Sequence, residues 1–136
     1  MNHKPEYRPR IVLADDNDQI LTFALMLLSA EFDVITAVHN GEEAIEAVNR
    51  LKPDVLVLDI EMPVLDGLRA AKRLIADGAL TKIVFLTGLE DPEHVEYARS
   101  MGASAFVFKA YILNDLPRAI SEALAGRFFS SFSERE

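Results

Sequence analysis

The chain has 136 residues, of which half are hydrophobic and 26% are charged, so it can form one globular domain but not two ordinary ones. Cysteine is absent, which excludes disulfides and thiolate metal sites. The net charge of −8, a polar N-terminus and the lack of an apolar run of about 18 residues predict a cytoplasmic protein that itself binds neither nucleic acid nor membrane.

Five short apolar runs alternate with amphipathic segments of helical length. The runs begin near Ile11, Asp33, Val55, Ile83 and Ala105, so 22 to 28 residues separate one start from the next. Most of them read as continuous Val, Ile and Leu rather than as an alternating pattern, which indicates strands buried on both faces. We therefore expect an α/β fold, with a five-stranded parallel sheet covered by helices on both faces.

Capping residues mark where the helices begin. Three helices are expected to start after side chains that accept hydrogen bonds from helical N–H groups, namely Asn40, Asp66 and Asp91. A proline follows the last of these, and Gly102 ends that helix. The fifth helix is expected to be capped by Asp115, with Pro117 in its first turn, and to end at Gly126.

The first helix is unusually apolar. Its helical spacing predicts a core-facing stripe of Ile20, Phe23, Ala24, Leu27 and Leu28. Leu21, Leu25 and Met26 would then point away from that stripe. They either fill the groove of a neighbouring helix or form a docking surface for a partner.

Polar side chains stand where four of the runs end. Asp15 and Asp16 follow the first, Asp59 the third, Thr87 the fourth and Lys109 the fifth. Ligands of open parallel sheets bind at the carboxyl ends of the strands. Any one of these residues alone could be structural, such as a helix cap at Asp16 or a turn residue at Asp59. Because they stand together at four strand ends, a shared ligand-binding or catalytic site is favoured over separate structural roles.

The residue types at these strand ends suit phosphoryl transfer. Three close carboxylates repel one another, and a hard divalent cation such as Mg²⁺ relieves that repulsion. A carboxylate can also act as the nucleophile, while a hydroxyl and an ammonium hold the oxyanion. No EF-hand, P-loop or dinucleotide motif accompanies the runs.

The motifs resemble those of the receiver domain of two-component response regulators. They are Asp15-Asp16, residues 53–67 (PDVLVLDIEMPVLDG), Leu86-Thr87-Gly88 and residues 102–109 (GASAFVFK). The resemblance covers about residues 9–126 and implies a flavodoxin-like, doubly wound sheet of order 2-1-3-4-5. It divides the chain into an N-terminal tail (1–9), the receiver domain (10–126) and a C-terminal tail or start of a linker (127–136).

The resemblance also implies a role for each site residue. Asp59 would accept a phosphoryl group from a sensor histidine kinase or a phosphotransfer protein. Mg²⁺ would be bound by Asp16, Asp59 and the backbone carbonyl of Glu61, with Asp15 acting mainly through water. Lys109 would pair with Asp59, Thr87 would hydrogen-bond the phosphoryl group, and Phe106 would be the aromatic switch. Helix 4, strand 5 and helix 5 would form the signalling and dimerisation face, and helix 1 would bind the kinase.

Some positions depart from the family pattern. Ala110 stands where the family has a proline joined by a cis bond, so we expect a trans bond and a looser or differently placed loop around Ala110-Tyr111. Phe106 replaces the commoner tyrosine. The segment 125–130 resembles the stretch that follows the receiver in LuxR/NarL-type transcription regulators. Its phenylalanines, Phe128, Phe129 and Phe132, either pack back on the fifth helix or belong to an interdomain or dimer contact.

Two other functions remain open from the sequence. One is a degenerate receiver that acts only as a protein-interaction module. The other is a phosphatase working through an aspartyl phosphate, although Glu61 stands where haloacid-dehalogenase-type enzymes have a second aspartate. The favoured reading is a switch that is not an enzyme beyond its own phosphotransfer and autodephosphorylation.

Overall fold

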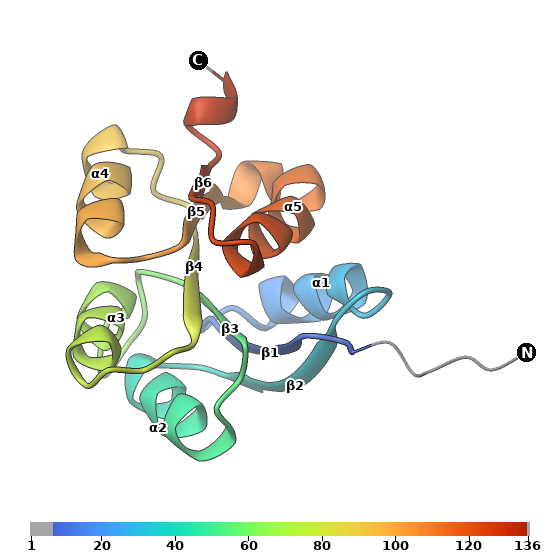
Figure 1. The fold of residues 1–136 in the computed structure, drawn as a ribbon, viewed down its shortest axis with the longest axis vertical. Helices are drawn as coiled ribbons and strands as arrows, with labels where there is room; N and C mark the ends of the chain where they lie inside the picture. The colour runs from blue at the N-terminus through green and yellow to red at the C-terminus, as the bar shows by residue number, and fades with distance from the viewer. Residues whose placement is uncertain (1–6, 136) are drawn as a thin grey trace, which may run out of the picture.

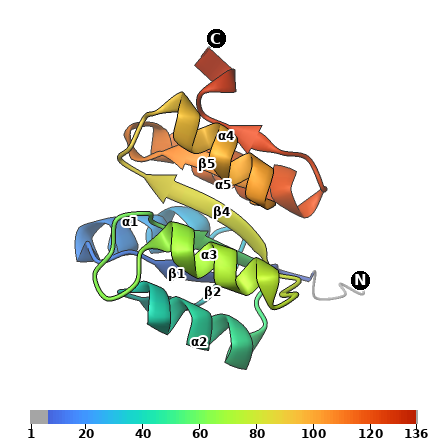
Figure 2. The same ribbon diagram turned by 90° about the vertical axis from the view of Figure 1, so that its left-hand side faces the viewer.

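A computed structural model describes residues 7–135 of the chain, so the proposed tail residues 1–6 and Glu136 lie outside it. The described residues form one sheet with helices on both faces (Figures 1 and 2). The strands are β1 (Arg10–Ala14), β2 (Asp33–Val38), β3 (Val55–Leu58), β4 (Lys82–Thr87), β5 (Ala105–Phe108) and β6 (Phe129–Ser130). The helices are α1 (Asp18–Leu28), α2 (Gly41–Leu51), α3 (Gly67–Ala76), α4 (Pro92–Met101) and α5 (Ile112–Leu124), with short 3-10 turns η1 (Lys109–Tyr111) and η2 (Ser133–Arg135).

The sheet is parallel throughout, with the order β2-β1-β3-β4-β5-β6. The expected α/β class and the order of the first five strands are therefore confirmed. The expected count of five is one too low, because the C-terminal segment returns to the sheet and pairs with β5. Two residues of strand are too short to stand out as an apolar run, which is why the sequence did not reveal them.

Alternate residues of the strands face two separate cores. Val12, Leu56 and Phe85 belong to the core beneath α2, α3 and α4. Ile11, Val57 and Val84 belong to the core beneath α1 and α5. Figure 1 shows the two helical layers on either side of the sheet. Burial on both faces explains why these strands read as continuous apolar runs.

The helix starts follow the predicted caps, with one exception. The side chains of Asn40, Asp66 and Asp91 accept hydrogen bonds from N–H groups in the first turns of α2, α3 and α4. The expected start of the fifth helix at Asp115 is wrong. This helix begins at Ile112, directly after η1, and Asp115 lies buried inside its first turn. The cap signal misled because Asp115 is satisfied by the C-terminal segment instead.

The predicted orientation of the first helix is wrong in part. Its buried residues are Leu21, Ala24 and Leu28, whereas Phe23 is exposed. Leu21 therefore belongs to the core and is removed from the expected docking surface. Leu25 and Met26 are 44% and 75% exposed, as the outward orientation requires. Nearly every position of α1 is apolar, so the pattern alone could not set the rotation of the helix.

Gly67 places the start of α3 against the end of β3. A Cβ atom at this position would lie 1.8 Å from the carbonyl oxygen of Asp59, a distance that no side chain can occupy. The Gly67 N–H donates to the carbonyl of Ile60 at 2.8 Å. The backbone that follows Asp59 is thereby held by a contact only glycine allows.

We predict that Gly67→Ala lowers the free energy of unfolding by about 1–3 kcal/mol or more, because the backbone of Asp59 must move away from the new methyl group. Gly88→Ala is the matched control, since a Cβ at Gly88 meets nothing within 4 Å. Chemical denaturation of the two variants measures the difference. Equal stability of both would show that the contact at Gly67 is not as tight as described.

Candidate functional site

The carboxyl ends of β1 and β3 bring Asp15 and Asp59 side by side. Ala14 pairs with Leu58 at the end of the ladder, and the Asp59 N–H donates to the carbonyl of Ala14 at 2.9 Å. The ladder thus extends one residue past each strand. Because Asp15 and Asp59 both occupy this last position, their backbone placement follows directly from the strand register.

Three carboxylates gather at this end of the sheet. One oxygen from each of Asp15, Asp16 and Asp59 lies within 4.8 Å of the others. Asp15 and Asp59 are buried, with only 3% and 4% of their surface exposed, while Asp16 is exposed. The possibility that Asp16 is only a helix cap is excluded, because Asn17 caps α1 with its own side chain. Asp16 is therefore free to serve the cluster.

Lys109 is the cation that joins the buried pair. Its Nζ lies 2.9 Å from Oδ2 of Asp15 and 3.1 Å from Oδ2 of Asp59. Lys109 begins η1, immediately after β5, so its side chain reaches across the end of β4. The sequence led us to expect the contact with Asp59 but not the one with Asp15. The sequence did indicate the contact between Lys109 and Asp15, because Asp15 follows a strand that was expected to lie next to β3.

The charges of the cluster are not balanced. Burial raises the pKa of Asp59, the charge of Asp15 raises it further, and Lys109 opposes both without cancelling them. Burial alone would lower the pKa of Lys109, but its contacts with Asp15 and Asp59 outweigh burial and raise it. The lysine is therefore firmly protonated, and the carboxylates retain excess negative charge.

The donor set suits a hard divalent cation. Carboxylate oxygens that share a partly open site with excess negative charge are the ligands that Mg²⁺ prefers. Asp15, Asp16 and Asp59 are the described residues that could hold such an ion. Asp16 and Glu61 also line a cleft of about 580 Å³ beside the cluster, together with Met62 and Asp66. The cleft reaches the cluster at Asp16, its exposed member.

Thr87 and Phe106 lie near the cluster but do not touch it. Thr87 is fully buried at the end of β4, and its Oγ1 accepts a hydrogen bond from the Leu89 N–H at 3.2 Å. Within residues 7–135, no hydrogen bond joins Thr87 to the three aspartates. Phe106 is also fully buried, with ring centroids 5.9 Å from Phe85 and 6.0 Å from Phe108.

The loop after Lys109 is ordered into η1 rather than loosened. The peptide bond between Lys109 and Ala110 is trans, as expected, and the described residues contain no cis bond. The turn continues directly into α5. Glu61 is exposed at the rim of the cleft, and none of the described hydrogen bonds or ion pairs involves its side chain.

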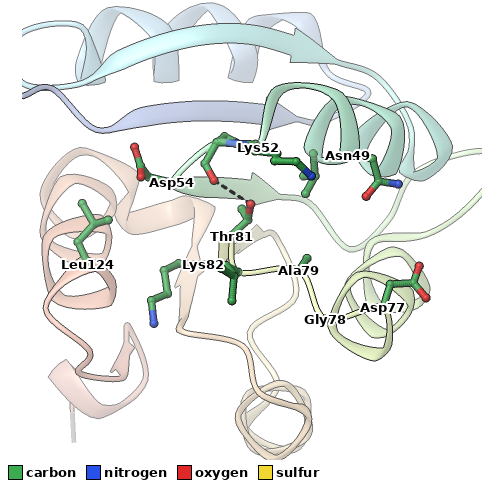
Figure 3. A pocket seen from close by; sticks show the side chains of 12 residues that line it. Asn49, Lys52, Asp54, Asp77, Gly78, Ala79, Thr81, Lys82 and Leu124 are labelled. Carbon is green, nitrogen blue, oxygen red and sulfur yellow. Dashed lines mark hydrogen bonds between the residues drawn. The ribbon is translucent and has the colours of Figure 1, made fainter.

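A second hollow lies at the opposite end of the sheet. It has a volume of about 610 Å³ and is lined by residues that include Lys52, Asp54, Asp77 and Lys82 (Figure 3). Asp54 precedes β3 and Lys82 begins β4, so this hollow sits at the amino ends of the strands. The Thr81 hydroxyl donates to the carbonyl of Pro53 within it. It is separate from the acidic cluster.

Comparisons with known proteins agree with this geometry. Residues 11–121 match the model of the response regulator receiver domain family. The transcriptional regulatory protein YvfU of Bacillus subtilis, itself uncharacterised, is 38% identical over 120 residues, which are 87% of this chain and 60% of YvfU. The chemotaxis protein CheY of Halobacterium salinarum is 28% identical over 85% of this chain and 96% of its own.

A solved structure shows the same fold. The signal receiver domain of the response regulator NarL from Mycobacterium tuberculosis superposes with a TM-score of 0.84 at 26% identity, over 90% of this chain and all of that domain. The chain thus spans only about three fifths of YvfU but nearly the full length of CheY. No helix within residues 7–135 is long and apolar enough to cross a membrane.

The excess negative charge of the cluster should lower the stability of the folded protein. A carboxyl group whose pKa is raised by folding favours the folded state less once it is ionised. We expect Asp59→Asn to increase the free energy of unfolding at neutral pH. The gain should shrink as the pH falls below the ordinary range for aspartate, where the wild-type carboxyl is neutral in both states.

Thermal denaturation of both proteins between pH 3 and pH 8 measures this difference. Asp77→Asn is the control, because Asp77 is exposed and distant from the cluster. Added Mg²⁺ should stabilise the wild type more than Asp59→Asn, since a ligand of the folded state stabilises it by mass action. A gain in stability that persists unchanged at pH 3 would contradict the electrostatic cause.

Proposed function

The chain belongs to the response regulator receiver domain family of two-component phosphorelay signalling, and we propose that Asp59 is its phosphoacceptor. The observation that carries the proposal is the buried Asp59 carboxylate, 3.1 Å from the Lys109 ammonium and clustered with two further carboxylates. A carboxylate at this position can attack phosphorus, and a cation and a metal site stand ready for the incoming charge.

The reaction moves one phosphoryl group. An oxygen of Asp59 forms a bond to phosphorus while the bond from phosphorus to the donor breaks, and the donor leaves with that electron pair. The donor is a phosphohistidine on a sensor histidine kinase or a phosphotransfer protein. Hydrolysis of the resulting aspartyl phosphate by water returns the carboxylate and releases inorganic phosphate. We expect no other enzymatic activity from the chain.

The neighbouring residues manage charge during transfer. Asp15, Asp16, Asp59 and the backbone carbonyl of Glu61 would hold Mg²⁺, which when bound neutralises the phosphoryl oxygens. Lys109 already contacts two carboxylates and follows the developing charge as a point cation. The exposure of Asp16 leaves room for metal-bound water.

Thr87 and Phe106 would carry the signal away from Asp59. To donate to a phosphoryl oxygen, the Thr87 hydroxyl, which accepts from the Leu89 N–H, would move toward the cluster. That movement opens space at the end of β4 beside the fully enclosed Phe106 ring. A phosphoryl group adds nearly two charges, which is sufficient to bias two surface states that differ by a few kcal/mol. The face of α4, β5 and α5 is the surface we expect to respond, including any homodimer contact.

We keep residues 10–126 as the proposed receiver domain, with the segment 127–135 paired to the edge of its sheet, and we expect the domain in the cytoplasm. The chain's net charge of −8 argues against direct binding of nucleic acid by this domain. For kinase docking we retain Leu25 and Met26, which project from α1 next to the exposed Phe23. Leu21 is not included because it is buried in the core.

The phosphoacceptor is tested with acetyl phosphate and Mg²⁺. We expect the intact protein to gain the mass of one labile phosphoryl group, and Asp59→Asn to gain none. Lys109→Gln should slow the reaction by about a hundredfold, as for loss of one oxyanion partner. Asp77→Asn, an exposed carboxylate at the other end of the sheet, is the control and should react like the wild type.

Two outcomes would replace the proposal. Failure of the wild type to form an adduct would favour a module that only binds proteins. Rapid multiple turnover of a generic phosphomonoester, abolished in Asp59→Asn, would favour a phosphatase.

Kinase docking is tested with the double variant Leu25→Glu/Met26→Glu. Charge on this apolar surface should slow phosphoryl transfer from the source organism's autophosphorylated histidine kinases by about tenfold or more, as expected for loss of interface anchors. Transfer from acetyl phosphate should be unchanged, because the pocket is intact. Leu80→Glu, at a residue 94% exposed beside the opposite hollow, is the control. Undiminished kinase transfer in the folded double variant would refute docking at α1.

A further inference from the structure

The segment 127–135, which the sequence suggested to be a tail or linker, is bound to the edge of β5. Phe129 and Ser130 pair in parallel with Ala105 and Phe106. The N–H of Ser131 donates to the carbonyl of Phe106 at 3.0 Å. Figure 1 shows β6 beside β5, with α4 and α5 to either side. The segment therefore covers the strand edge in the middle of the expected signalling face.

A buried polar network holds the segment in place. The Phe108 N–H donates to Oγ of Ser131 at 3.1 Å, and this hydroxyl donates to Oδ2 of Asp115 at 2.7 Å. Arg135 donates from Nη1 to the same Oδ2 at 2.7 Å and to the Ser131 carbonyl at 3.0 Å. Asp115 is only 5% exposed. One hydroxyl and one guanidinium from the segment thus satisfy a buried carboxylate of α5.

This network favours the bound position of the segment over the released one. Across the described residues, the side chain of Asp115 has hydrogen bonds and ion pairs only with the segment. A buried charge without its partner is strongly unfavourable, so loss of Arg135 favours release of the segment and hydration of Asp115. The ion pair between Asp115 on α5 and Arg135 on the segment therefore holds the segment in place, and we call this pair the lock.

The segment also contacts the turn that carries Lys109. The guanidinium of Arg135 lies 3.4 Å from the centre of the Tyr111 ring, and Tyr111 ends η1, which Lys109 begins. Ser131 bonds the backbone of Phe106 and Phe108, the strand residues that lead into the same turn. The bound segment and the acidic pocket thus share β5 and η1 as a common support.

We infer that residues 127–135 are a detachable strand whose docking on the β5 edge is coupled to occupancy of the Asp59 pocket, so that a phosphoryl group on Asp59 releases it. This inference rests on the proposed phosphoacceptor. A phosphoryl group inserted between Asp59 and Lys109 displaces the Lys109 ammonium, and η1 moves with it. Arg135 stacks on Tyr111 of the same turn, so a displacement of η1 would disturb this contact and weaken the lock. Release uncovers the β5 edge and Asp115 on the signalling face.

The lock is tested first in the unmodified full chain, by hydrogen exchange of individual amides. We expect Arg135→Ala to speed exchange of the Ser131 and Phe108 amides by on the order of tenfold, the effect of losing a charged hydrogen bond. Arg127→Ala is the matched control, because Arg127 belongs to the same segment but pairs at the surface with Glu122 of α5, away from Asp115. Arg135→Lys should restore part of the protection. Exchange that is equal in wild type and Arg135→Ala would overturn the lock.

The coupling is tested with Mg²⁺ and beryllofluoride, a mimic of the phosphoryl group, with Mg²⁺ alone as control. Saturation should speed exchange of the Ser131 amide in the wild type. Because coupling is reciprocal, Arg135→Ala should bind beryllofluoride more tightly by a matching factor. Binding of beryllofluoride with unchanged Ser131 exchange would refute the coupling and leave the phosphoacceptor intact. Absence of both beryllofluoride binding and an acetyl phosphate adduct would refute the phosphoacceptor, and the coupling with it.

Discussion

The ammonium of Lys109, placed between the carboxylates of Asp15 and Asp59, is the interaction on which the site depends. It joins the ends of β1, β3 and β5, which are not all neighbours in the sheet. Without this cation the two buried acids would repel each other in a medium where charges are weakly screened. One lysine cannot neutralise three carboxylates, so the cluster retains the negative charge that a metal ion requires.

The fold provides the rigidity that this balance needs. The backbone ladder extends past β1 and β3 by one residue, and Gly67 packs α3 directly against the carbonyl of Asp59. Both contacts involve main-chain atoms, so neither can adapt through a change of rotamer. The proposed acceptor is therefore held still, while Lys109 reaches it through a flexible side chain and Thr87 stands at a strand end without a hydrogen bond to it. A fixed acceptor with movable partners suits a switch in which small displacements have to be transmitted.

A second buried ion pair lies on the far side of β5, where the C-terminal segment is bound. Asp59 and Asp115 are both buried carboxylates, and each is paired with a cation, Lys109 or Arg135. The two ion pairs lie at either side of a single turn, η1, to which Lys109 and Tyr111 belong. Because the pairs share one support, the inferred switch would transmit a change at the first pair to the second. The proposed signalling face would then have a covered and an uncovered form.

Local features of the sequence determined the parallel α/β class, the first five strands, the caps Asn40, Asp66 and Asp91, and the residues that follow each strand. These depend on apolar runs and single capping side chains, which act over a few residues. Tertiary structure alone decided four other features. They are the rotation of α1, the start of α5, the contact between Lys109 and Asp15, and the strand β6. Each depends on which distant group lies opposite: an all-apolar helix has no preferred face until it packs, and Asp115 caps nothing once Ser131 and Arg135 satisfy it.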